Sequence, residues 1–100
     1  MKKHTKTLLV IVAEAVLESR LVRDARQCGA QGWTVAEVHG EGHEGVREGA
    51  WEADRTIEIK LICDESVANA IAEHVLSTYA PNYSVAMHFS LVQVLRPERF

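Results

Sequence analysis

The order in which the hydrophobic periodicity changes along the chain restricts its fold more than any other feature. Residues 7–13 form a continuous, β-branched apolar run, which is typical of a central strand covered on both faces. Helical periodicity and strand-like alternation then succeed one another to the end of the chain. The predicted order is strand 7–13, helix 14–28, strand 33–38, strand 56–62, helix 64–79 and strand 84–95.

This order consists of two strand–helix–strand halves. It predicts an α+β, ferredoxin-like βαββαβ fold, with an antiparallel four-stranded sheet and both helices on one face. The strands at 33–38 and 56–62 are expected to pair as a hairpin across a long connection. A chain of 100 residues makes one domain, which we assign to residues 1–100.

Local signals place the helix ends and the core stripes. Gly29 is positioned for a left-handed C-cap, and Asp64 for an N-cap. The expected apolar stripe of the first helix is Leu17, Leu21, Ala25 and Cys28, and its expected polar side is Glu18, Arg20, Arg23, Asp24 and Arg26. The expected stripe of the second helix is Val67, Ala70, Ile71, Val75, Leu76 and Tyr79.

The charge and cysteine content exclude several classes of protein. The chain has 11 Lys and Arg against 14 Asp and Glu, a net charge of −3, and no basic cluster in the sequence. Duplex nucleic acid and anionic membranes are therefore not expected partners. No apolar run is long enough to span a bilayer, so we expect a cytoplasmic protein. Cys28 and Cys63 lack metal-ligand spacing and are predicted to be reduced.

The first and last predicted strands carry apolar side chains on both faces. Two helices can cover only one face of a four-stranded sheet, so the second face should be buried by something outside the monomer. The sequence therefore predicts self-association through the helix-free face. The alternative is a partly apolar sheet that stays exposed.

A long connection, about residues 39–55, separates the two central strands and contains four glycines and five acidic residues. Connections of this length are usually functional or disordered. Gly40 and Gly42 allow a tight turn whose N–H groups could bind phosphate or another anion, although a simple hairpin would use the same residues. The cations that could close on such an anion are Arg47, Arg55, Arg96 and Arg99. Trp51 is either an anchor for a target protein or packs on its own domain.

A metal site and an enzyme active site are alternatives to this anion-binding site. His39, Glu41, His43 and Glu44 could ligate a divalent metal if the loop fixed their geometry. A small oligomeric enzyme could instead use a strand histidine such as His88 as a general base. No Ser, Cys or Thr stands in a context that indicates an activated nucleophile, so an enzyme is not expected.

The chain resembles the PII signalling proteins. The resemblance is most specific over Gly-Trp-Thr-Val-Ala-Glu-Val-His-Gly-Glu-Gly at 32–42, and Thr-Ile-Glu-Ile-Lys-Leu-Ile-Cys-Asp at 56–64 is similar to the family's third strand. It implies a ferredoxin-like homotrimer that binds adenine nucleotide between subunits. The 39–55 connection would then be the family's T-loop, which senses the ligand and engages a target protein.

The resemblance also implies roles for individual residues. Thr34, Gly40 and Gly42 would contact the nucleotide where the T-loop begins, and Glu58 and Lys60 would line the base region. Arg96 would contact phosphate. Arg47 would be the T-loop cation that faces the phosphates or bicarbonate.

Departures from the family pattern narrow the expected ligand. His43-Glu44 stands where PII proteins continue Arg-Gln, and Tyr79-Ala-Pro-Asn-Tyr83 replaces a glycine-rich segment with a phosphate-binding lysine. ADP or AMP is therefore expected rather than ATP. Gly42 followed by Val46-Arg47 is similar to the PII-like branch associated with bicarbonate transporters and carboxysomes. That branch implies bicarbonate as a co-ligand, and a transporter or carbon-fixation protein as the target.

Overall fold

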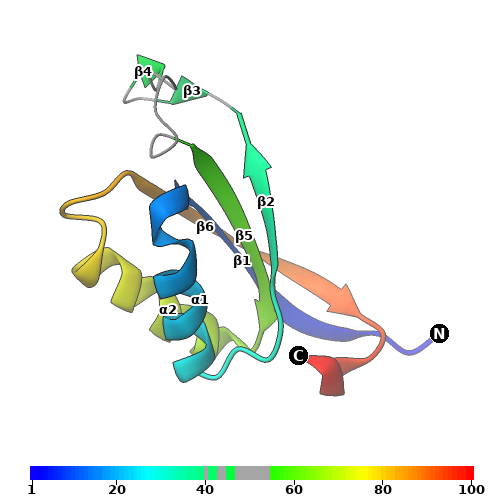
Figure 1. Cartoon of the computed structure of the whole chain (residues 1–100). Coiled ribbons are helices and arrows are strands. Elements are labelled where there is room, and N and C mark those ends of the chain that lie inside the picture. The colour runs from blue at the N-terminus through cyan, green and yellow to red at the C-terminus, as the bar shows by residue number, and fades with distance from the viewer. Residues whose placement is uncertain (40, 43–44, 47–54) are drawn as a thin grey trace.

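The computed structural model describes residues 1–39, 41–42, 45–46 and 55–100. Two helices lie against one face of a long, twisted sheet (Figure 1). The strands are β1 (His4–Glu14), β2 (Thr34–Val38), β3 (Glu41–Gly42), β4 (Gly45–Val46), β5 (Thr56–Cys63) and β6 (Val85–Val94). The helices are η1 (Ala15–Leu17), α1 (Glu18–Gln27), α2 (Glu65–Thr78) and η3 (Pro97–Arg99).

The main sheet has the strand order β2-β5-β1-β6, and every neighbouring pair is antiparallel. This confirms the predicted ferredoxin-like βαββαβ fold. The predicted hairpin is also confirmed, since β2 pairs with β5 across the long connection, with Thr34 opposite Lys60. Within that connection β3 and β4 pair as a separate two-stranded ribbon.

The core lies between the two helices and the face of the sheet that they cover. Alternate residues of β1 and β5 point into it, and Leu9, Ile11, Ile59 and Leu61 are at most 1% exposed. Because side chains alternate along a strand, the residues between them must occupy the opposite face. The residues of β1 and β5 that are buried in the core therefore determine which of their neighbours face away from the helices.

The helix ends follow the predicted signals in part. Gly29 has a φ of +111°, the left-handed conformation that glycine adopts without strain, and so the predicted C-cap is confirmed. Asp64 stands at the N-cap of α2, but its side chain makes no capping hydrogen bond. Its Oδ1 instead lies 2.6 Å from Nζ of Lys6, since an ion pair competes for the same oxygen.

Several predicted boundaries and faces were wrong. Glu14 belongs to β1 and not to the first helix, because pairing with Thr56 keeps it extended. On α2, Ala70 and Leu76 are exposed, while Ala68 and Ala72 are buried, because the helix turns the i, i+3, i+4, i+7 stripe that contains Ile71 and Val75 toward the sheet. Asp24, predicted on the polar side of α1, is only 7% exposed.

The helix-free face carries a mixture of apolar and charged side chains. Leu8, Val12 and Val92 are half-buried on it in the single chain.

The β1–β6 pair extends beyond the helices (Figure 1), so Phe89 and Leu91 stay 48% and 75% exposed although they share the helix-covered face. Within the described part of the chain, no helix is both long and apolar enough to cross a membrane.

Candidate functional site

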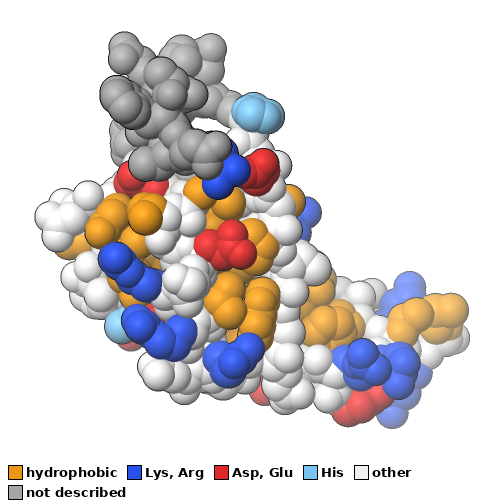
Figure 2. Space-filling model, in the orientation of Figure 1, with side chains coloured by type: hydrophobic (Ala, Val, Ile, Leu, Met, Phe, Trp, Pro, Cys, Tyr) orange, Lys and Arg blue, Asp and Glu red, His pale blue; other side chains and the backbone are white. Residues whose placement is uncertain are grey.

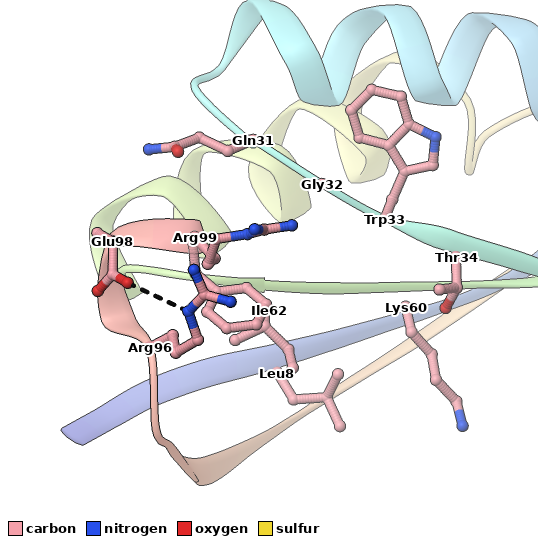
Figure 3. A pocket seen from close by; sticks show the side chains of 11 residues that line it. Leu8, Gln31, Gly32, Trp33, Thr34, Lys60, Ile62, Arg96, Glu98 and Arg99 are labelled. Carbon is pink, nitrogen blue, oxygen red and sulfur yellow. Dashed lines mark ion pairs between the residues drawn. The ribbon is translucent and has the colours of Figure 1, made fainter. Parts of the chain in front are cut away.

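A cavity lies where β2 begins and β6 ends. Its volume is about 760 Å³. The segment after β6 turns back so that Arg96, Glu98 and Arg99 lie beside the start of β2 (Figure 3). The lining residues come from three strands, the segment before β2 and the C-terminal segment, and are Leu8, Gln31, Gly32, Trp33, Thr34, Lys60, Ile62, Arg96, Glu98, Arg99 and Phe100.

The cavity brings together four of the residues that the sequence nominated for nucleotide binding: Thr34, Lys60, Arg96 and Arg99. Sheet pairing explains the first two, since Thr34 and Lys60 are opposite each other and therefore share the helix-free face. Residues separated by more than 60 positions in the sequence thus lie around one cavity.

The other nominated residues lie elsewhere. Glu58 is on the same face as Lys60, and its Oε1 lies 3.5 Å from Nζ of that lysine, but it does not line the cavity. Gly42 belongs to β3, in the long connection. Gly40, Arg47 and Trp51 lie outside the described residues.

The balance of charge in the cavity favours an anionic ligand. Three cations, Lys60, Arg96 and Arg99, face a single acid, Glu98, whose Oε1 lies 3.5 Å from Nε of Arg96. Both members of that pair are about two-thirds exposed, so the bond between them is weak and a stronger anion can replace it. The phenyl ring of Phe100 provides apolar surface beside these cations, whereas the indole of Trp33 points toward α1 (Figure 3). Cations beside an aromatic ring suit a ligand with both a phosphate and a flat apolar part.

The long connection leaves the sheet at its other end. Glu37, near the end of β2, pairs with Arg55 at 2.8 Å, and the N–H of Ala15 donates to the carbonyl of Arg55. At the same end, the N–H of Ser84 donates to Oε2 of Glu14 at 2.7 Å. The cavity and the long connection are therefore separated by the length of β2, about 13 Å from Thr34 to Val38.

The family profile of the nitrogen regulatory protein P-II matches residues 6–99. The match includes both helices, the whole main sheet from Lys6 of β1 onward, and the cations after β6. The chain belongs to the P-II family. This is a family of regulatory proteins and not of enzymes.

Solved PII structures agree with this assignment. A candidate PII-like signaling protein from Thermus thermophilus is 35% identical, covers 100% of this chain and 99% of its own length, and has a TM-score of 0.86. CPII from Thiomonas intermedia, bound to ADP, AMP and bicarbonate, is 23% identical, with coverage of 99% and 96% and a TM-score of 0.87. At that identity the second likeness shows the fold alone. The comparison with curated proteins found no match.

In this PII chain, sequence reasoning missed Trp33 as a cavity residue. It lines the cavity, and Cζ of Arg26 lies 5.0 Å from its ring centroid, within the range of a cation–π contact. The available signal was a large aromatic beside Gly32 at the start of a strand. The sequence pattern identifies Trp33 only as a β-forming residue and as part of the family resemblance at 32–42.

The buried carboxylate of Asp24 was also missed. It accepts hydrogen bonds from Tyr79 Oη, from His74 Nε2 at 2.8 Å and from Arg23 Nε at 3.0 Å, and so links α1 to the end of α2. Burial opposes ionisation, but these hydrogen bonds together hold the pKa of Asp24 below its ordinary value. Burial and the same carboxylate raise the pKa of Tyr79. The contacts join residues about 50 positions apart, so helical periodicity could not reveal them.

The alternative sites gain no geometric support. His88 is exposed on β6 opposite Val10, and it does not line the cavity. Among the described residues, no three His, Cys, Asp or Glu side chains lie close enough to hold a metal ion. Of the predicted metal ligands, His43 and Glu44 lie outside the described residues.

Proposed function

We propose that the chain is a homotrimeric PII-like sensor that binds ADP or AMP in clefts between subunits. The observation that carries this proposal is the cavity with its three cations and the aromatic ring of Phe100. It is accessible in the single chain. It is lined by Thr34, Lys60 and Arg96, which the family resemblance assigns to the nucleotide, and by Arg99, which the sequence nominates as a phosphate-binding cation. PII-family membership and the ADP and AMP bound to CPII support the choice of ligand.

The arrangement along β2 supports a site shared between two copies. The cavity lies at the start of β2, whereas the long connection, with Gly40 and Gly42, begins after its end. A second copy could bring its own connection to the cavity of the first. The half-buried apolar residues Leu8, Val12 and Val92 of the helix-free face would then be covered by neighbouring copies.

In the same proposal, bicarbonate is the co-ligand and Arg47 responds to the bound anions. Ligand binding changes the conformation of the T-loop, and Trp51 then contacts the target, a bicarbonate transporter or a carbon-fixation protein. Three of the CPII structures contain bicarbonate together with ADP, which supports this choice. The branch-level resemblance at Gly42 and Val46-Arg47 supports the same class of target.

Isothermal titration calorimetry with ADP, AMP, cyclic AMP and ATP, each with and without bicarbonate, tests the proposal directly. We expect ADP or AMP to bind more tightly than ATP. Arg96→Gln should weaken ADP binding about tenfold or more, because a charge-assisted hydrogen bond contributes about 1.5–3 kcal/mol. Lys3→Gln, which removes the same charge from the exposed N-terminal segment, is the matched control and should leave binding unchanged.

Heat from none of the four nucleotides would overturn the sensor proposal. A light-scattering mass equal to the monomer at micromolar concentration would overturn the shared-cleft arrangement. Equal affinity of Arg96→Gln and Lys3→Gln for ADP would show that the cavity described above is not the binding site.

A further inference from the structure

The outer face of α1 carries a row of three arginines that neither the cavity nor the long connection uses. Arg20, Arg23 and Arg26 recur every third residue, and this spacing keeps them on one side of the helix over about 9 Å. All three side chains are exposed. Figure 2 shows blue side chains gathered over the helical side of the molecule.

Each of these arginines is held in place by a neighbour within the chain. Arg20 Nη1 donates to the hydroxyl of Tyr83 at 3.3 Å, and Arg23 Nε donates to Asp24 Oδ1 at 3.0 Å. Arg26 lies over the indole ring of Trp33. A guanidinium has five N–H donors, so these contacts orient each group and leave most of its donors facing solvent. Side chains ordered in advance lose less entropy when a partner binds.

Acidic side chains of the described residues neutralise little of the positive charge of the arginine row. Among the described residues, Arg20 and Arg26 form no ion pair with a carboxylate, and Arg23 shares Asp24 with His74 and Tyr79. Ser19 and Gln27 are the exposed uncharged residues of α1 that share this side. The arginine row therefore forms a positive strip on a chain whose net charge is −3.

We propose that the arginine row of α1 is a docking surface for an acidic helical segment of a partner protein. Planar guanidinium groups bind carboxylates through two parallel hydrogen bonds, and carboxylates spaced three residues apart on a helix would match the row. Nucleic acid is the less suitable partner, because a negatively charged chain with three aligned cations offers few phosphate contacts. This surface is additional to the proposed nucleotide cleft and T-loop.

Fluorescence anisotropy at low salt can test the surface with a helical peptide in which glutamate recurs every third residue among alanines. We expect this peptide to bind and its glutamine counterpart not to bind. The double variant Arg20→Gln/Arg26→Gln should weaken binding about twofold to thirtyfold, because each exposed ion pair contributes about 0.2–1 kcal/mol. Arg23 is left intact because it also contacts buried Asp24.

The double variant Lys2→Gln/Lys3→Gln is the matched control, since it removes the same charge from exposed positions outside α1. It should bind the glutamate peptide as the unmodified protein does. Circular dichroism should be unchanged in Arg20→Gln/Arg26→Gln. ADP affinity should be unchanged in Arg20→Gln alone, whose partner Tyr83 does not line the cavity, and this separates the test from that of the nucleotide cleft.

Three results would overturn the proposal. The first is no binding of the glutamate peptide at low salt, and the second is equal weakening in the two double variants. The third is tighter binding of duplex DNA that is lost in Arg20→Gln/Arg26→Gln, because that result would identify a nucleic-acid surface instead.

Discussion

The two faces of the main sheet are built from the same strands and have different surroundings. On the helix-covered face, Leu9, Ile59 and Leu61 are at most 1% exposed. On the helix-free face, Thr34 and Lys60 stay accessible in the single chain and line the cavity. One face therefore stabilises the folded chain, and the other stays accessible and contributes residues to the cavity.

This difference shows how a short strand can serve two purposes. Lys60 lies between Ile59 and Leu61, both of which are buried in the core. The strand alternation that buries these two residues also directs Lys60 to the opposite face, toward the cavity. Alternate positions of β5 therefore contribute either to the stability of the fold or to the proposed ligand site. A substitution at one of these positions can change one property without the other.

The largest effect is expected from a charge placed on the helix-free face. Val92→Glu on β6 lies opposite Lys6, so the single chain should tolerate it. In the proposed trimer it would bury a carboxylate in each subunit contact, at a cost of several kcal/mol per ion. We expect light scattering to give the monomer mass. Leu76→Glu, at an exposed position of α2, is the control that should remain trimeric. A trimeric Val92→Glu would contradict assembly through this face.

The second prediction concerns the helix-covered face. Leu9→Ala should lower the free energy of unfolding by about 2–5 kcal/mol, because it removes a fully buried side chain and leaves a cavity. Leu76→Ala removes the same atoms from a position that is 59% exposed, and should change stability by about 0.5 kcal/mol or less. Urea denaturation at fixed protein concentration measures both. Equal losses would contradict the assignment of the core.

The third prediction concerns the polar contact between the helices. Asp24→Asn should cost about 1.5–3 kcal/mol at neutral pH, because it weakens hydrogen bonds to a charged acceptor. The pKa of Asp24 is lowered by folding, so its contribution is present above the unfolded pKa of about 3.9 and is lost as pH falls through the folded value. Stability measured across that range should therefore converge for the two proteins in acid.

Tyr79→Phe sharpens this test because it removes one of the three donors to Asp24. We expect a smaller loss of stability at neutral pH, and a higher pH at which the contribution of Asp24 disappears. A difference between unmodified protein and Asp24→Asn that stays constant through the acid range would contradict a charged Asp24.

The smallest effect is expected at the edge of the cavity. Glu98→Gln removes the acid that pairs with Arg96, so the arginine is free for an anionic ligand. We expect ADP to bind about twofold more tightly, since exposed ion pairs contribute little. Glu73→Gln on α2 is a charge-matched control that should leave calorimetric affinity unchanged. Weaker binding by Glu98→Gln would indicate that Glu98 contacts the ligand.

Local sequence pattern was sufficient to predict the helices and strands and part of the candidate site. The glycine at position 29, the alternation from Ile57 to Leu61 and the order of the strands predicted the fold correctly, because each depends on residues close in sequence. The family resemblance nominated Thr34, Lys60 and Arg96, and the cluster of arginines after the last strand nominated Arg99; the four residues meet at one cavity. Trp33 and Asp24 were missed, since their contacts come from residues on other elements.

The fold class, the hairpin with its long connection and the family resemblance follow from hydrophobic periodicity and spaced motifs, because both are local properties of the chain. The meeting of the cations after β6 with the start of β2, and the burial of Asp24 between the helices, depend on how the elements pack. The same is true of the arginines of α1, each of which is held by a residue elsewhere in the chain or by the adjoining Asp24. A sequence pattern reports which side of an element a residue occupies, whereas tertiary packing determines which partners that residue meets.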